Sequence, residues 1–244
     1  MLSEQQIANI TNAYYACFCG MNPDRVTGGV HLICSEARNE RLRGFGCRYT
    51  VFALMRQDVL IIAYAPQHAA FFDALSNRSS EEILTAMHQA FHLKKTQLMV
   101  FRQERVHDFG SARILQTADY PLYEAFFRES APHADPTGWL QSYFEERAAK
   151  GYFTGCFADG ALTSVCDAPD MPYMEGAIQH TGIITLPAVR RRGYARAAAA
   201  LAAHHLLEND VCPQWECRAD NAASIALAES VGYAKYGIAF ILEE

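Results

Sequence analysis

The sequence predicts a mixed α/β fold in two parts, and three observations support this prediction. Segments with helical spacing of apolar residues alternate with short, strand-like apolar runs. The chain has 244 residues, of which 50% are hydrophobic, so it can form one large domain or two of ordinary size. The pattern breaks at "RVHDFGSA", where we place a boundary between an α/β unit over residues 1–107 and a second unit over residues 111–244.

The first unit reads as helix, strands, helices and strand. Leu2–Phe18 is predicted to be an amphipathic helix, because Ile7, Ile10 and Tyr14 recur at helical spacing. Strands are expected in "TGGVHLICSE", "YTVFALMRQDVLIIAYAP" and the buried run "TQLMVFR". Helices are expected in "PQHAAFFDALS" and "SSEEILTAMHQAFHL", the second capped by Ser79 or Ser80.

The second unit begins with a strand in "ARILQTA" and two helices, in "YPLYEAFFRES" and "TGWLQSYFEERAAKG". A strand pair turning at Asp159-Gly160 and a strand over Gly176–Thr185 follow. Next come an alanine-rich helix suited to lying close to a sheet, the strand "PQWECRA", the helix "NAASIALAESVG" and the strand "YGIAFIL".

Charge and composition exclude several classes of protein. The formal net charge of −6 argues against non-specific nucleic-acid binding, which needs a broad basic surface. No secretory signal is visible, and the apolar run "VLIIAYA" is too short to span a bilayer. We therefore expect a cytoplasmic protein without membrane or nucleic-acid partners.

The eight cysteines do not follow zinc-ligand spacings and are predicted to be small buried hydrophobic residues. The pair His204 and His205 is no metal site, because adjacent helix residues point about 100° apart. No metal is expected.

The segment "RRRGYAR" directly precedes the alanine-rich helix and is the clearest functional motif. The first N–H groups of a helix lack intrahelical partners, and glycine lets the backbone approach a bulky anion. A strand, a glycine turn and a helix N-terminus together form an anion site, to which arginines add charge. Neither a Walker A loop nor a three-glycine dinucleotide motif is present, so the segment predicts a different phosphate site.

Arg190-x-x-Gly193-x-Ala195 resembles the Q/R-x-x-G-x-G/A signature of the GNAT superfamily of N-acetyltransferases. "ADNAASIALAESVGY" is similar to a second element of that superfamily, and the order of elements from Ser111 onward also fits. The resemblance implies a central mixed, largely antiparallel sheet flanked by helices. "CPQWEC" and the residues after it are similar to a two-domain subgroup that includes the zwittermicin A resistance protein.

The resemblance implies acetyl-CoA as cosubstrate and a primary amine as acceptor. By position, the backbone of three strand residues would pair with pantetheine, the turn would hold the pyrophosphate, and two side chains of the next helix would contact the cofactor. These residues are Ile183, Ile184, Thr185, Arg190, Arg191, Arg192, Gly193, Tyr194, Ala195, Arg196, Asn221 and Ser224.

The catalytic positions of the family do not carry over. Ala228 stands where members often have a tyrosine acid, and Gln179 where some have a glutamate base. Glu175 would share a strand face with Gln179 if the strand extends that far, so it is the leading base candidate. Tyr233 is a candidate acid, with core packing as the alternative.

These observations together predict an acetyl-CoA-dependent N-acetyltransferase that acts on a small-molecule or peptide amine by direct attack in a ternary complex. The alternative is a non-catalytic CoA-binding sensor or partner-binding module. The sequence leaves open the acceptor, the role of residues 1–107, and whether the chain forms a homodimer.

Overall fold

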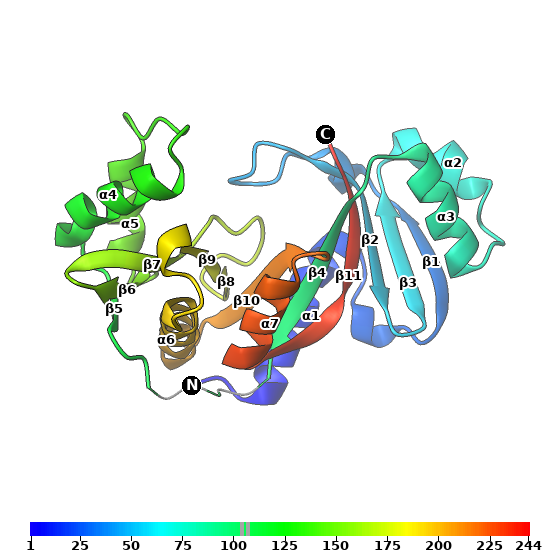
Figure 1. Cartoon of the computed structure of the whole chain (residues 1–244). Coiled ribbons are helices and arrows are strands. Elements are labelled where there is room, and N and C mark those ends of the chain that lie inside the picture. The colour runs from blue at the N-terminus through cyan, green and yellow to red at the C-terminus, as the bar shows by residue number, and fades with distance from the viewer. Residues whose placement is uncertain (103–104, 106–107) are drawn as a thin grey trace.

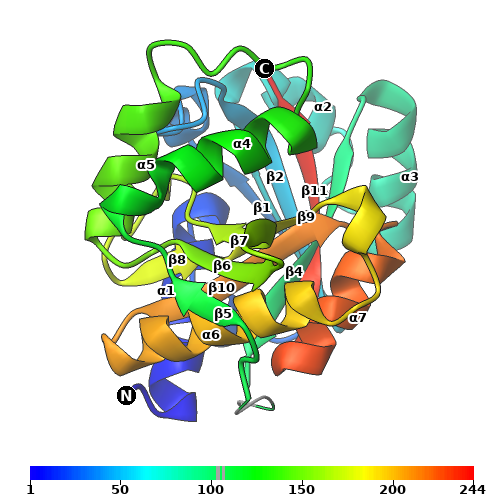
Figure 2. The ribbon, with the colours of Figure 1, turned by 60° about the vertical axis from the view of Figure 1, so that its left-hand side comes forward.

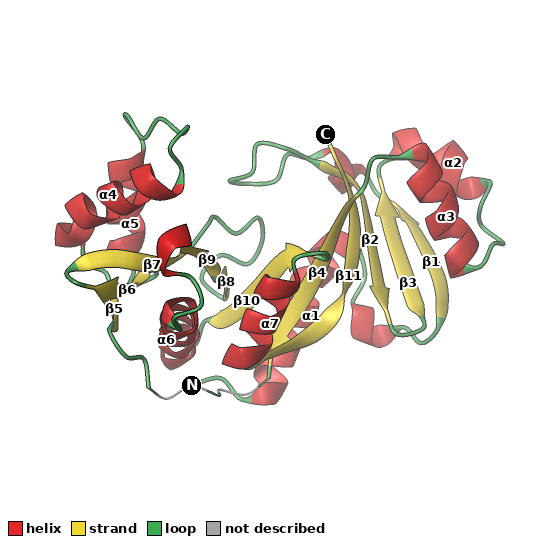
Figure 3. Cartoon of the chain, in the orientation of Figure 1, coloured by secondary structure: helices red, strands yellow, loops and turns green. Residues whose placement is uncertain are grey.

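The computed structural model describes residues 1–102, 105 and 108–244. Its α-helices are α1 (Glu4–Cys19), α2 (Ala69–Asp73), α3 (Ser80–Ala90), α4 (Tyr120–Ser130), α5 (Leu140–Ala149), α6 (Tyr194–Glu208) and α7 (Ala222–Val231). Its strands are β1 (Gly29–Cys34), β2 (Tyr49–Arg56), β3 (Val59–Tyr64), β4 (Lys94–Phe101), β5 (Ala112–Ile114), β6 (Thr154–Ala158), β7 (Ala161–Asp167), β8 (Ile178–His180), β9 (Gly182–Thr185), β10 (Cys212–Arg218) and β11 (Tyr233–Glu243). Figures 1 and 3 show helices flanking mixed sheets, which confirms the predicted fold class.

The strands form two sheets. The larger has the order β1-β3-β2-β11-β4-β10-β8, and the smaller has the order β5-β6-β7-β9. β4 lies between β10 and β11 and is antiparallel to both, while β11 also pairs with β2. The predicted units 1–107 and 111–244 therefore share the larger sheet. The predicted end of the first unit at residue 107 lies outside the described residues.

Local sequence signals explain several element boundaries. Ser3 and Gln6 form a capping box at the start of α1, and Ser79 and Glu82 form one at the start of α3. Of the two predicted caps for α3, Ser79 is thus the one used. The β6–β7 turn contains Asp159 and Gly160 with φ of 51° and 79°, as a tight hairpin turn requires.

Helices cover both faces of the sheets. α1 packs on β4, β10 and β2, while α7 packs on β11 and β10 (Figure 1). α4 packs on β7 of the smaller sheet, and α6 contacts β5, β6, β7, β9 and β10. The close approach of α6 depends on the buried alanines Ala198, Ala199, Ala202 and Ala203, as the alanine-rich sequence predicts. No helix in the described ranges combines the length and apolar character needed to cross a membrane.

The strand predicted over Gly176–Thr185 is divided in two, so this prediction is wrong. β8 starts at Ile178 and pairs in parallel with β10, whereas β9 pairs with β7 in the other sheet. The interruption falls at Thr181, whose N–H donates to the Gln214 carbonyl at 2.9 Å. Beyond this bond β9 and β10 diverge, because each belongs to a different sheet.

Candidate functional site

A cavity of about 740 Å³ lies beside β9. Its walls come from β9, the turn before α6 and the start of α7, which lie close together in Figure 2. The lining comprises Ile183, Ile184, Thr185, Val189, Arg190, Arg191, Gly193, Tyr194, Ala195, Arg196, Asn221, Ala223, Ser224 and Leu227. The structure thus brings together every residue predicted to bind the cofactor except Arg192, which lines a neighbouring recess with Arg196.

The β9 side of this cavity is a strand edge. β9 pairs with β7 along one edge, from Gly182 to Thr185. Along its other edge, no strand of the described part of the chain continues the ladder beyond Thr181. Backbone N–H and C=O groups are obligatory hydrogen-bonding groups, so this edge can pair with an extended, amide-containing ligand.

The turn before α6 directs further backbone N–H groups to the cavity. Arg191 and Gly193 have positive φ of 64° and 86°, and Gly193 is an N-cap without a side-chain hydrogen bond. The first hydrogen bond within α6 runs from the Ala197 N–H to the Gly193 carbonyl, at 3.0 Å. The preceding N–H groups therefore lack helical acceptors, and the helix dipole adds positive charge. A Cβ placed on Gly193 would meet nothing within 4 Å, so an anion can approach the backbone.

The turn carries four arginines: Arg190, Arg191, Arg192 and Arg196. None of them forms an ion pair with a carboxylate of the described residues. Arg190 Nε donates to the Thr185 carbonyl at 3.2 Å, which ties the turn to the end of β9. In a protein of net charge −6, unpaired cations beside unpaired N–H groups indicate a ligand with more than one negative charge.

Asn221 and Ser224 bound the cavity at the start of α7. Asn221 caps α7, since its Oδ1 accepts a hydrogen bond from the Ser224 N–H at 3.1 Å. Ser224 Oγ in turn accepts one from Nε1 of the buried Trp215, also at 3.1 Å. Both side chains are therefore fixed in position by the fold.

Tyr233, the predicted acid, lies in the core outside this cavity. Its side chain is 2% exposed, and its ring packs edge-on against Phe101. Its hydroxyl is hydrogen-bonded to Thr181 Oγ1 at 3.0 Å, and burial raises the pKa of the phenol well above its usual value. Ala228, the family's tyrosine position, belongs to the same core.

Glu175, the predicted base, lies in the turn before β8. The expectation that Glu175 and Gln179 share one strand face is wrong, because the strand starts only at Ile178. Glu175 Oε2 lies 2.6 Å from Nη1 of Arg43, and its Oε1 lies 3.9 Å from Nζ of Lys150. The carboxylate is thus held in surface ion pairs and does not line the cavity.

His180 lies at the point of divergence. Its Nε2 accepts a hydrogen bond from the Glu216 N–H at 3.2 Å, which supplies the acceptor that β9 no longer provides. Burial lowers the pKa of the imidazole to about 4, so the ring is neutral near pH 7. Nδ1 is buried and finds no partner in the described ranges.

Two carboxylates that sequence reasoning missed lie near this point. Glu216 accepts a hydrogen bond from the Tyr15 hydroxyl at 3.1 Å, and burial raises its pKa to about 7. Asp167 ends β7 directly opposite Gly182, and burial raises its pKa to about 6. Glu216 lies on the face of the larger sheet that packs against α1, opposite α7. Asp167 lies on the face of the smaller sheet that it shares with Val165, which packs with α4 and α5, opposite α6. Two features of the sequence could have pointed to these carboxylates: Gln214 and Glu216 are polar at alternating positions of a strand, and Asp167 is an acid at the end of an apolar strand.

Residues 156–237 match the sequence profile of the GNAT acetyltransferase family. The chain carries a GNAT acetyltransferase domain. This confirms the predicted superfamily, whose cosubstrate is acetyl-CoA, while the two-domain subgroup stays a prediction. No curated protein sequence matches the chain.

Solved structures share the fold of the GNAT domain and of the strands around it. An acetyltransferase of the GNAT family from Colwellia psychrerythraea is 12% identical, with a TM-score of 0.58 over 99% of this chain and 97% of that one. A GCN5-related N-acetyltransferase from Sphaerobacter thermophilus is 15% identical, with a TM-score of 0.54 over 68% of this chain and 57% of that one. A GNAT-family protein from Novosphingobium aromaticivorans is 20% identical, with a TM-score of 0.48, and the match spans 62% of this chain and 64% of that one. The chain thus spans less than two thirds of the last two proteins.

Proposed function

We propose that this protein is an acetyl-CoA-dependent N-acetyltransferase that acts on a primary amine in a ternary complex. The observation that carries the proposal is the cavity in which the free edge of β9 meets the anion-binding turn of α6. The CoA diphosphate has the charge that the turn and its arginines can neutralise. The amides of pantetheine can pair with Ile183, Ile184 and Thr185 as an added strand. The residues present therefore fit the cosubstrate.

When bound, acetyl-CoA supplies a thioester whose C–S bond breaks as the C–N bond to the amine forms. The ammonium gives up two protons, of which one protonates the leaving thiolate and one goes to solvent. An alkylammonium has a pKa of about 10.4, so a base has to remove a proton before attack.

We assign this base to Glu216 and not to Glu175. The pKa of Glu216, raised to about 7 by burial, suits a base that works near neutral pH. Glu216 also belongs to β10 at the point where β9 diverges, whereas Glu175 is ion-paired with Arg43. For Tyr233 we propose a packing role, since its hydroxyl is buried and bonded to Thr181.

A non-catalytic CoA-binding module is the alternative function. Ala228 and Gln179 favour it, because neither can donate or accept a proton in the family's usual positions. Glu216 favours the enzyme, because a buried carboxylate with a raised pKa is typical of a catalytic group.

Calorimetric titration with acetyl-CoA tests the donor site, with Gly193→Asp as the variant. Asp places a side chain and a negative charge in the turn, so we expect wild-type binding that the variant loses. Incubation with an amine panel, with free CoA quantified by chromatography, then separates the enzyme from a binding module. A well-folded wild type that binds no acetyl-CoA would refute both functions, whereas binding without turnover of any amine would favour the module.

A further inference from the structure

A second recess lies on the other side of β9 from α6. It has a volume of about 250 Å³ and lies between α4, the start of α5, β7 and β9. Ile184 lines both this recess and the donor cavity, so the two spaces meet at one residue of the free strand. Ile184 and Trp139, which also lines the recess, are 46% and 43% exposed. Large apolar side chains exposed around a concave site indicate ligand binding.

The walls of the recess are aromatic and held in place. Trp139 Nε1 donates to the Asp135 carbonyl at 2.7 Å, which fixes the indole. Phe127 meets Trp139 edge-on with ring centroids 5.5 Å apart, and Tyr143 meets it with centroids 6.0 Å apart. The faces of such rings attract apolar groups and cations.

Asp167 is the charged residue of the recess. No cationic side chain of the described part of the chain forms an ion pair with it. Its neighbour Arg147 is committed elsewhere: it donates to the Ala168 carbonyl at 2.7 Å, pairs with Asp170 and lies over the Tyr143 ring. Burial raises the pKa of Asp167 to about 6, and the nearby charge of Arg147 offsets only part of this rise.

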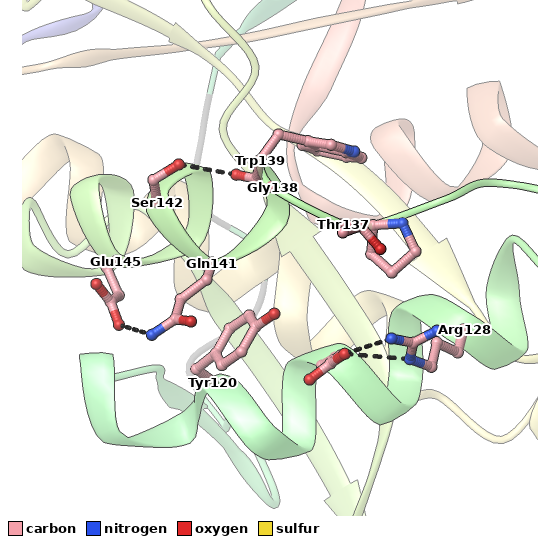
Figure 4. A pocket seen from close by; sticks show the side chains of 10 residues that line it. Tyr120, Arg128, Thr137, Gly138, Trp139, Gln141, Ser142 and Glu145 are labelled. Carbon is pink, nitrogen blue, oxygen red and sulfur yellow. Dashed lines mark hydrogen bonds and ion pairs between the residues drawn. The ribbon is translucent and has the colours of Figure 1, made fainter.

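A larger pocket of about 550 Å³ on the outer side of α4 and α5 differs in this respect. Figure 4 shows its polar groups bonded to one another: Arg128 pairs with Glu124, and Gln141 donates to Glu145. This outer pocket shares no lining residue with the donor cavity. Its one carboxylate without an ion pair, Glu145, already accepts the Gln141 amide, and no residue of β9 lines the pocket.

We infer that the aromatic recess binds the acceptor: a small primary amine with a single aromatic or branched aliphatic substituent, whose ammonium group pairs with Asp167. This inference rests on the proposed acetyltransferase function and narrows its substrate class. Lys, Arg and His are absent from the residues that line the recess, so a carboxylate on the ligand would find no partner. Sugar-like amines with many hydroxyl groups would leave those groups unsatisfied against the aromatic walls. The binding-site position of Asp167 also explains why a buried carboxylate without an ion pair is tolerated there.

Calorimetric titration with phenethylamine, with and without saturating CoA, tests the inference. We expect binding to wild type that Asp167→Asn weakens at least about tenfold, the loss expected for a charge-assisted hydrogen bond. The matched control is Asp159→Asn, which changes an exposed acid at the turn of the same hairpin and should bind as wild type does. Phenylalanine, which adds a carboxylate to the same ring and amine, should bind at least about tenfold more weakly than phenethylamine.

Acetyl-CoA titration of the same variants separates this inference from the proposed function. Asp167→Asn should keep the wild-type affinity for acetyl-CoA, because Asp167 does not line the donor cavity. If phenethylamine binds in an Asp167-dependent way but acetyl-CoA does not bind, the amine site stands and the proposed function fails. If acetyl-CoA binds and phenethylamine binds neither form of the protein, or binds Asp167→Asn as tightly as wild type, the inference is overturned.

Discussion

Replacing Gly182 by alanine should displace the Asp167 carboxylate without disturbing the donor cavity. A Cβ placed on Gly182 comes 2.4 Å from Asp167 Oδ1 and 3.6 Å from His180 Nδ1. An ordinary contact needs at least 3.4 Å, so the carboxylate has to move by about 1 Å. The φ of Gly182 is not positive, so alanine adds no backbone strain.

A shift of this size in the group that anchors a substrate is expected to weaken phenethylamine binding about tenfold or more. The affinity for acetyl-CoA should change by less than about twofold. The unfolding midpoint should change by no more than a few degrees. Alanine reduces the conformational entropy of the unfolded chain, which stabilises the folded protein by about 0.4–1 kcal/mol and offsets part of the cost of the close Cβ–Asp167 contact.

A double-mutant cycle shows whether the effect acts through Asp167. In the Asp167→Asn background the anchor is already lost, so Gly182→Ala should weaken phenethylamine binding little further. Calorimetry on the four proteins measures the coupling. Additive losses from the two substitutions would refute the reasoning, because alanine would then disturb the recess by another route.

Three further predictions concern charge. Arg190→Ala should weaken acetyl-CoA binding more at low than at high salt, because ions screen the arginine's contribution; equal loss at all salt concentrations, measured by calorimetry, would contradict it. Asp167→Asn should be more stable than wild type above about pH 6 and lose this advantage towards pH 4. The pKa of Asp167 is raised in the folded state, so ionisation of this carboxyl between pH 4 and pH 6 destabilises the folded wild type by about 1–3 kcal/mol. Thermal unfolding of both proteins across this pH range would detect the difference. With an amine that the enzyme acetylates, wild-type kcat/KM should rise with pH through about 7 as Glu216 ionises. Glu216→Gln should lose most of the rate and also this rise with pH. A pH profile of kcat/KM that is unchanged in the variant would exclude Glu216 as the base.

The donor cavity could be predicted from the sequence because its parts are local. The turn from Arg190 to Arg196 is contiguous, and its anion-binding character follows from glycine, helix start and charge. Asn221 and Ser224 are three residues apart at the start of one helix, so their common face is also a local property. The structure places these residues around one cavity without requiring any long-range pairing to be guessed.

The acceptor side could not be predicted because it depends on pairing between distant segments. Asp167 becomes notable only when β7 pairs with β9 and sets it opposite Gly182, and Glu216 only when β10 meets α1 at Tyr15. The insertion of β4 between β10 and β11 is likewise invisible in "TQLMVFR", which reads simply as a buried strand. The expectation that Glu175 shares a strand face with Gln179 failed for a similar reason, since strand periodicity does not reveal where pairing starts.

The interruption at Thr181 links the donor and acceptor sides. Because β8 stays with β10 while β9 joins β7, the same divergence frees the β9 edge and brings Gly182 against Asp167. Such a divergence would leave the Glu216 N–H without an acceptor, at a cost of about 1–3 kcal/mol for a buried donor. His180 Nε2 accepts the bond from this N–H, and burial keeps the imidazole neutral, so that it can go on accepting across the physiological pH range. A single histidine therefore stabilises the open arrangement on which both proposed binding sites depend.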